Sequence, residues 1–149
     1  KLSQIMRYII YEGKKDTVSL ETEITFLENF VALEKIRHED NASIAFTVQG
    51  NPHKINIPPL LFMPLLENAF KHGFSNNGHS WVEAAMLIEN KEITFEIKNS
   101  NACGARGSRS GIGLENLKKR LTLLYPKKHG LLIKSTDKQF EINLILKLS

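Results

Sequence analysis

The sequence predicts an α+β fold, a two-layer sandwich in which helices cover one face of a mixed, largely antiparallel sheet. Segments whose apolar residues recur at helical spacing are interspersed with segments in which every second residue is apolar. Several alternating segments come in sequential pairs separated by short turns, which is typical of antiparallel hairpins. With 149 residues, of which 42% are hydrophobic and 24% charged, the chain is long enough for one compact core and has the composition of a folded domain.

Two helices are predicted at the start of the chain. In the first, residues 1–12, an apolar stripe recurs at i, i+3, i+4 and i+7, and Gly13 ends it. The second runs over 20–38, with Ser19 as its N-cap. The residues of the two apolar stripes are Leu2, Ile5, Met6, Ile9 and Ile10, and then Leu20, Ile24, Leu27 and Val31.

The rest of the chain alternates between strands and helices. Residues 60–72 are apolar on nearly every face, which predicts a buried helix with Pro64 near its first turn. A glycine-rich stretch, Asn99 to Gly113, shows no periodicity, and loops of this length are usually functional. The other predicted elements are a strand at 43–49, a hairpin formed by 80–88 and 92–98, a helix at 114–124, and strands at 131–135 and 140–148.

Composition excludes several classes of protein. Twenty Lys and Arg against 16 Asp and Glu give a net charge of +4, which fits an anionic ligand but is too weak and dispersed to indicate nucleic acid. One cysteine, Cys103, excludes an internal disulfide and a multi-cysteine zinc cluster. The longest apolar run, 57–66, contains three prolines and is far shorter than the ~20 residues of a membrane span. Because apolar residues already follow helical spacing from Leu2 onward, we expect this chain to be a piece of a longer protein that starts inside a helix.

Four polar residues stand out in the predicted helix 60–72. Asn68, Lys71 and His72 are spaced i, i+3, i+4 and share one edge, with Glu67 beside them. Burying such groups is costly unless partners are supplied. The edge is therefore either a binding site or simply the exposed end of a core helix.

A second candidate is the run Gly111-Ile112-Gly113-Leu114, where the glycine-rich stretch passes into a helix. Free amides at a helix N-terminus favour phosphate, and glycines let the backbone approach it closely. The run lacks the Gly-Lys-Ser/Thr ending of a Walker P-loop, and no strand-glycine-helix unit has Rossmann spacing. Neither common nucleotide motif is present.

Together, Glu-Asn-Ala-x-Lys-His-Gly at 67–73 and Gly-Ile-Gly-Leu-Glu-Asn-Leu at 111–117 resemble the ATP-binding (HATPase) domain of sensor histidine kinases, in particular the LytS/YehU type. This domain belongs to the superfamily of gyrase, Hsp90, histidine kinase and MutL (GHKL). The resemblance extends over essentially the whole chain and implies a Bergerat-type ATP-binding fold. Its other elements are Leu2-Ser3, Arg7-Tyr8, Val18-x-Leu20-x-x-Glu23, Glu34-x-x-Arg37 and Ile57-Pro58-Pro59-Leu60.

The resemblance implies a role for each site residue. Asn68 would bind the Mg²⁺ that bridges the ATP phosphates, Lys71 would meet phosphate oxygens, and His72 would line the nucleotide edge. Glu67 is the candidate carboxylate for polarising the attacking group. The residues assigned to the phosphate-covering lid and the helix that follows it are Gly111, Gly113 and Leu114, with Arg106 and Arg109 either reaching the terminal phosphate or remaining solvated.

One position departs from the family pattern. The family has an aspartate that reads the adenine amino group, followed two residues later by glycine, and this chain has Asn99 and Asn101 there. An asparagine oxygen still accepts a hydrogen bond from that amino group, but without charge. Adenine affinity and selectivity are therefore the properties that this substitution affects.

The resemblance also implies a domain organisation and partners. Residues 1–17 would be the end of the dimerisation and phosphoacceptor helix with its connector, and 18–149 the catalytic ATP-binding domain. His38 superficially resembles an acceptor, but we expect the acceptor histidine upstream of this chain. The implied partners are ATP with Mg²⁺, a cognate response regulator, and a second copy joined through upstream helices, with no nucleic acid. The implied location is cytoplasmic, in a membrane-anchored sensor.

Three functions remain open at this point. The first is the catalytic domain of a two-component histidine kinase, which passes phosphate from ATP to histidine and then to a regulator. The second is a degenerate domain of the same fold that only binds nucleotide or acts as a scaffold. The third is a related ATPase or serine kinase, but those ATPases have a catalytic glutamate four residues before the metal asparagine, where this chain has Pro64.

Overall fold

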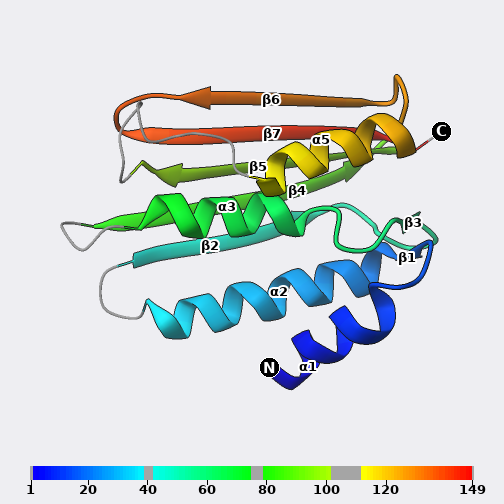
Figure 1. Cartoon of the computed structure of the whole chain (residues 1–149), viewed down its shortest axis with the longest axis horizontal. Helices are drawn as coiled ribbons and strands as arrows, with labels where there is room; N and C mark the ends of the chain where they lie inside the picture. The colour runs from blue at the N-terminus through cyan, green and yellow to red at the C-terminus, as the bar shows by residue number, and fades with distance from the viewer. Residues whose placement is uncertain (1, 39–41, 75–78, 102–111, 149) are drawn as a thin grey trace.

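The computed structural model describes residues 2–38, 42–74, 79–101 and 112–148. In this part of the chain, helices lie against one face of a five-stranded sheet (Figure 1). The elements are α1 (Leu2–Arg7), the π-helix η1 (Tyr8–Glu12), β1 (Val18–Ser19), α2 (Leu20–Arg37), β2 (Ala42–Gln49), β3 (Asn56–Ile57), α3 (Met63–Gly73), β4 (Ser80–Glu89), β5 (Glu92–Ser100), α5 (Ile112–Leu124), β6 (His129–Ser135) and β7 (Gln139–Lys147).

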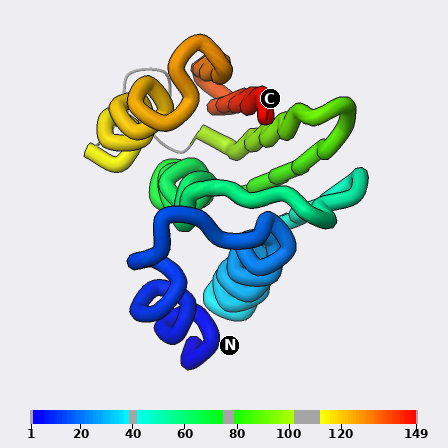
Figure 2. Tube along the Cα trace, turned by 90° about the vertical axis from the view of Figure 1, so that its right-hand side faces the viewer, coloured from blue at the N-terminus to red at the C-terminus, as the bar shows by residue number. Residues whose placement is uncertain are grey.

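The sheet is mixed and largely antiparallel, which confirms the predicted α+β sandwich. Its strand order is β2-β4-β5-β7-β6, and only the β2–β4 pair is parallel. Along β4, β5 and β7 the burial alternates residue by residue, because successive side chains point to opposite faces. Figure 2 shows α2, α3 and α5 together on one side of the strands, so the buried face is the one that the helices cover.

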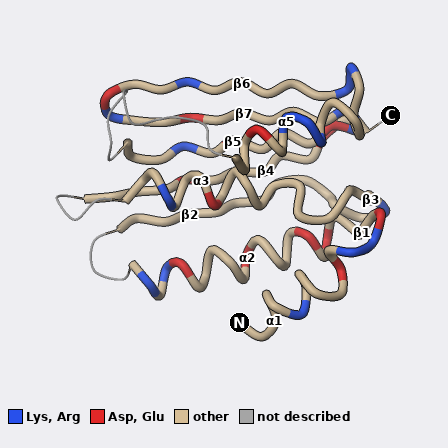
Figure 3. The backbone as a smooth tube through the Cα atoms, in the orientation of Figure 1, with Lys and Arg blue, Asp and Glu red and all other residues tan. Residues whose placement is uncertain are grey.

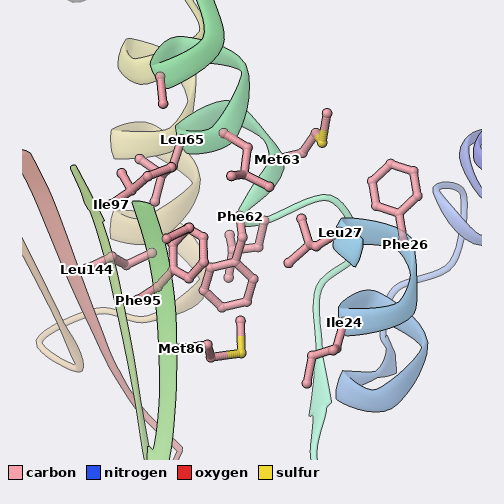
Figure 4. Packing of buried hydrophobic residues seen from close by; sticks show 14 of the residues in the cluster. Ile24, Phe26, Leu27, Phe62, Met63, Leu65, Met86, Phe95, Ile97 and Leu144 are labelled. Carbon is pink, nitrogen blue, oxygen red and sulfur yellow. The ribbon is translucent and has the colours of Figure 1, made fainter. Parts of the chain in front are cut away.

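The core lies between α2, α3 and the central strands (Figure 4). Phe62, just before α3, and Phe95 of β5 are fully buried, with ring centroids 5.1 Å apart. Leu27 of α2 and Leu65 of α3 are also fully buried. This packing fixes α3 directly above the middle of the sheet.

The β4–β5 hairpin matches the prediction closely. Glu89 pairs with Glu92, and the two residues between them, Asn90 and Lys91, have φ values of 53° and 59°. Two consecutive residues with positive φ are the signature of a type I′ turn, whose twist matches that of the flanking strands. The turn fixes the register that places Asn99 of β5 on the helix-facing side of the sheet.

Helix α2 also begins where the sequence predicts. The Thr22 amide donates to the Ser19 hydroxyl oxygen at 3.1 Å, which is an N-cap bond. The predicted stripe of α2 is buried, and the structure adds the buried carboxylates Glu23 and Glu34, which the pattern did not predict. The sequence also did not predict the small β1–β3 sheet, in which Val18 pairs with Ile57.

The first predicted helix differs from the structure in two ways. It changes from an α-helix to a π-helix at Tyr8, whose carbonyl accepts the Gly13 amide at 3.1 Å. Of its predicted apolar stripe, only Ile5 is buried, while the other four side chains are 44–61% exposed. Instead, Tyr8 is buried and stacks on Phe26 of α2, with ring centroids 4.2 Å apart.

Helix α3 begins later than predicted, at Met63 rather than at residue 60. Leu60 has φ +59°, in the left-handed region, and therefore cannot belong to a right-handed helix. The helix is also not buried on nearly every face, since Glu67 and Lys71 are exposed. It is amphipathic, with its apolar face on the sheet and a polar edge that faces away from it.

Charged residues are interspersed along the helices and strands rather than gathered on one face (Figure 3). Among the residues that the structure describes, no helix combines the length and the apolar character that crossing a membrane requires.

Candidate functional site

A pocket of about 400 Å³ lies between α3 and the beginning of α5. It brings together two segments about 40 residues apart in sequence, both of which the sequence analysis singled out. Its lining consists of Pro64, Glu67, Asn68, Lys71 and His72 of α3 with Ile112, Gly113 and Leu114 of α5. Six of the predicted site residues are among these eight.

The α3 wall follows from helical spacing. Leu65, Leu66, Ala69 and Phe70 are buried, with Phe70 against Phe30 of α2 at 5.7 Å between ring centroids. The side chains at the intervening positions therefore share the opposite edge, since residues three and four apart lie on one face. Pro64 also belongs to this wall, although it was not among the predicted site residues. It lies four residues before Asn68, and this spacing places both residues on the same edge of the helix, so the sequence could have identified it.

The α5 wall is held by apolar packing on its other side. Leu114, Leu117 and Leu121 are buried and attach the helix to the core. The first amides of an α-helix have no acceptor within the helix, so the start of α5 presents donors at the pocket. Among the residues that the structure describes, a Cβ added to Gly113 would meet nothing within 4 Å, so on that side the backbone is open to a ligand.

The Lys71 ammonium supplies the positive charge at the far end of the α3 edge. Lys71 is exposed, and His72 next to it is half-buried. Burial and the neighbouring Lys71 ammonium lower the pKa of His72 below its ordinary value of 6.5. His72 is therefore neutral near pH 7 in the free chain, and an anion in the pocket would favour its protonation.

The side-chain nitrogen of Asn68, Nδ2, is buried and has no hydrogen-bond partner within the described part of the fold. A buried polar atom without a partner is costly, and in native structures such atoms concentrate where a ligand or an ion binds. The amide is thus available to an occupant of the pocket.

Asn99 lies beside the pocket rather than in its lining. It is fully buried on the helix-facing side of β5, against the last turn of α3, where a Cβ added to Gly73 would lie 3.1 Å from the Asn99 Cβ. Its Nδ2 donates to the Ser100 carbonyl at 2.8 Å, and its Oδ1 has no partner within the described ranges. With Nδ2 engaged, Oδ1 is an acceptor without a donor.

Ser100 fastens the end of α3 to the sheet. Its hydroxyl donates to the Gly73 carbonyl at 2.6 Å and accepts from the Trp81 amide at 3.0 Å. Nothing in the sequence marks Ser100 as a site residue. Its alternation pattern is that of an outward-facing strand residue, and only the structure places the α3 end beside it.

Several predicted residues cannot be placed. Gly111, Arg106, Arg109 and Cys103 lie outside the described residues. His38, the superficial acceptor candidate, is engaged at the end of α2, where its Nε2 lies 3.2 Å from a Glu34 carboxylate oxygen and its ring stacks on Phe74 at 4.0 Å.

A larger pocket, of about 550 Å³, lies beyond the other end of α5, near Tyr125 and the Asn90-Lys91 turn. None of its lining residues has a buried, unpartnered polar atom among those that the structure describes. The 400 Å³ pocket has one in Asn68, together with a cation and a helix N-terminus. It is therefore the better candidate site.

Comparison with known proteins finds sequence similarity to bacterial sensors. A family model described as "Histidine kinase" matches residues 1–42. The chain is 28% identical over 152 residues to the sensor protein LytS of Staphylococcus haemolyticus, and 28% identical to the sensor histidine kinase/phosphatase LytS of Staphylococcus aureus. Each alignment covers 92% of this chain but 26% of the relative, so the chain spans about a quarter of their length.

Solved structures with a similar fold are histidine kinases. The histidine kinase domain of the blue-light activated kinase from Erythrobacter litoralis matches with a TM-score of 0.63 and 14% identity, over 99% of this chain and 79% of that one. The histidine kinase ThkA, solved in complex with the response regulator protein TrrA, matches with a TM-score of 0.61 and 10% identity, over 99% of this chain and 47% of that one. At these identities the likeness establishes the fold.

Proposed function

Because the chain is similar in sequence to LytS sensor histidine kinases and shares the fold of histidine kinase domains, we propose that it is the catalytic, ATP-binding part of a two-component sensor kinase. In this proposal, it transfers the γ-phosphate of ATP to a histidine upstream of this chain, for relay to a response regulator. The observation that carries the proposal is the pocket in which the polar edge of α3 faces the N-terminus of α5.

The residues of the pocket fit a magnesium-chelated triphosphate. Mg²⁺ usually takes only one or two protein oxygens and completes its coordination with water and substrate phosphates. The described residues contain no group of three or more His, Cys, Asp or Glu side chains that would hold a metal by itself. The pocket offers the amide oxygen of Asn68, with the Glu67 carboxylate beside it, which suits a metal that arrives with its nucleotide.

Five of the pocket residues have a task in this proposal. Asn68 holds the metal through its amide oxygen, and the Lys71 ammonium attracts the phosphate oxygens. The first amides of α5, at Gly113 and Leu114, donate to phosphate at the positive end of the helix dipole. Mg²⁺, when bound, neutralises phosphate charge, so catalysis consists mainly of positioning and electrostatic stabilisation. Glu67 would accept a proton from, or orient, the attacking imidazole.

Asn99 would recognise the base. Since its Nδ2 donates to the Ser100 carbonyl, its unpartnered Oδ1 can accept a hydrogen bond from the exocyclic amino group of adenine. Guanine carries a carbonyl oxygen at the corresponding position, which would leave two acceptors facing each other. We therefore expect ATP to be preferred over GTP, with a weaker contact than a charged aspartate would make.

The surrounding organisation is part of the same proposal. Residues 1–17 would form the end of the phosphoacceptor helix and its connector, and 18–149 the catalytic domain. The partners would be a response regulator and a second copy joined through upstream helices, and the chain would work in the cytoplasm as part of a membrane-anchored sensor. The alternative, a degenerate domain that only senses or scaffolds, is favoured by one observation, the uncharged Asn99 at the aspartate position.

Calorimetric titration of the chain with ATP in the presence and absence of Mg²⁺ tests the proposal. We expect saturable binding that requires Mg²⁺ and is stronger for ATP than for GTP. Absence of binding at millimolar ATP would support the degenerate domain, and equal binding of GTP would contradict the role of Asn99. Transfer of the γ-phosphate to histidine needs a separate test, in the longer protein that contains the phosphoacceptor.

We further expect nucleotide binding to raise the pKa of His72. In the free chain, burial and Lys71 depress it, whereas the negative phosphates would stabilise the imidazolium. At pH values between the pKa of His72 in the free chain and its pKa in the complex, the complex holds more protons than the free chain. The affinity for Mg-ATP should therefore rise as the pH falls through this window, and it should level off below the pKa of the free chain.

NMR titration of the histidine Cε1–H signals, with and without Mg-ATP, measures this change. His72→Gln assigns the signal and should abolish the proton uptake, and His53, which lies outside the pocket lining, is the internal control. An unchanged His72 titration curve at saturating nucleotide would show that the phosphates do not lie beside it.

A further inference from the structure

The segment that leads into α3 contains a strained residue held by two opposite charges. Leu60 has φ +59°, a left-handed conformation that is unfavourable for a branched L-residue and persists only where its surroundings enforce it. Its amide donates to Glu23 Oε2 at 3.3 Å, and its carbonyl accepts from Arg120 Nη1 at 3.3 Å. The Arg120 Nη2 also donates to the Pro59 carbonyl, at 3.0 Å.

The Glu23 carboxylate is itself held in place by a second contact. Glu23 of α2 is fully buried and accepts a hydrogen bond from the Tyr8 hydroxyl. Burial raises the pKa of Glu23, while Arg120 opposes this by favouring its ionised form. Hydrogen bonds to charged groups are stronger than neutral ones. We call this arrangement of Glu23, Leu60 and Arg120 the Leu60 clamp.

The clamp connects the two walls of the candidate site. Leu60 stands three residues before α3 begins at Met63, and α3 carries Asn68 and Lys71. Arg120 belongs to α5, about one and two-thirds turns beyond Leu114. Elsewhere α5 is held to the core by leucines, whose apolar contacts are non-directional. The two hydrogen bonds of Arg120 are directional and determine where α5 lies along the start of α3.

We propose that Arg120 is a positioning residue for the nucleotide pocket: through the backbone of Pro59 and Leu60, it sets the spacing between α3 and the N-terminus of α5. This inference rests on the proposed function in one respect, the identity of the ligand. It assigns a task to three motif positions that the site itself does not use, Glu23, Pro59 and Leu60. Arg120 touches no lining residue of the pocket in the contacts that the structure records.

Two substitutions at Arg120 and one control on the same helix test this inference. Arg120→Gln removes the charge and the paired donors, and Arg120→Lys keeps the charge but cannot donate to two carbonyls with the fixed geometry of a guanidinium. The control is Lys119→Gln, since Lys119 is exposed on the adjacent position of α5. ATP affinity is measured by calorimetry with Mg²⁺, and amide signals are measured by NMR without nucleotide.

We expect Arg120→Gln to weaken Mg-ATP binding about tenfold and to shift the Asn68 side-chain amide and the Gly113 and Leu114 backbone amides in the nucleotide-free chain. Lys119→Gln should change neither. Arg120→Lys should recover thermal stability but not affinity, which separates positioning from simple structural support. If Arg120→Gln does not fold, Arg120→Lys decides by the same two readouts.

Unchanged affinity together with unchanged Gly113 and Leu114 signals would overturn the inference. So would a loss of affinity that Arg120→Lys restores completely, because charge alone would then suffice. If the unaltered chain binds no nucleotide, the proposed function fails, but the NMR shifts in the nucleotide-free variants still decide whether Arg120 positions α5.

Discussion

Replacing Asn68 with alanine is expected to abolish measurable Mg-ATP binding, with an affinity loss of about 100-fold or more. The substitution removes the only side-chain amide among the described lining residues, whose Nδ2 is buried without a partner in the described part of the chain. Because this nitrogen has no partner there, thermal stability should hold or rise slightly. Calorimetry with ATP and Mg²⁺ measures the affinity, and thermal unfolding checks the fold.

Asn29→Ala, on α2 and outside the pocket lining, is the matched control and should leave binding unchanged. Asn68→Asp keeps an oxygen ligand and should retain Mg²⁺-dependent binding. In the longer protein that contains the phosphoacceptor, transfer of labelled γ-phosphate from ATP to histidine should be lost in Asn68→Ala. A folded Asn68→Ala chain that binds Mg-ATP normally would refute the metal role of Asn68.

Gly50→Ala is expected to destabilise the chain by about 3 kcal/mol or more. Gly50 has φ +103°, a conformation that residues with a Cβ rarely adopt. An added Cβ would also overlap the backbone carbonyl oxygen of Ile88 on the neighbouring strand β4. Backbone atoms of a central sheet cannot move aside cheaply, so both effects act together. Denaturant unfolding monitored by circular dichroism measures the loss.

Gly130→Ala is the matched control for this experiment. Gly130 lies in β6 of the same sheet, and an added Cβ there would meet nothing within 4 Å. Its substitution should therefore change the free energy of unfolding by no more than about 0.5 kcal/mol. Equal effects of the two substitutions would mean that the left-handed backbone at Gly50 is not required by the fold.

The elements that the sequence predicted well are those decided by local patterns. The β4–β5 hairpin follows from alternation on both sides of a two-residue turn, and α2 follows from its stripe and the Ser19 cap. The polar edge of α3 was also predictable, because its spacing lies within one helix. That edge meets the N-terminus of α5 through chain folding, which only the family resemblance anticipated.

The errors arise where tertiary contacts override local preference. The apolar run around Leu60 looks helical, but Glu23 and Arg120 hold Leu60 in a left-handed conformation from positions far away in the chain. The π-helix η1 begins at Tyr8, which is buried and donates a hydrogen bond from its hydroxyl to Glu23. The spacing of residues along the sequence does not reveal that Leu60 and Tyr8 contact these distant charged side chains. The sequence also did not predict that Asn99 is buried, since an asparagine at the end of a strand is usually a surface turn residue.

The anchoring of α3 has a consequence for how the site accommodates different occupants. Its start is held by the backbone bonds at Leu60, its end by the Ser100 hydroxyl on the Gly73 carbonyl, and its inner face by the sheet. The fold therefore holds the helix that carries Asn68 and Lys71 in one position. Because Arg120 ties α5 to the same segment through two hydrogen bonds, we expect the two walls to keep one spacing, so that a ligand of matching length should bind more tightly than a shorter one.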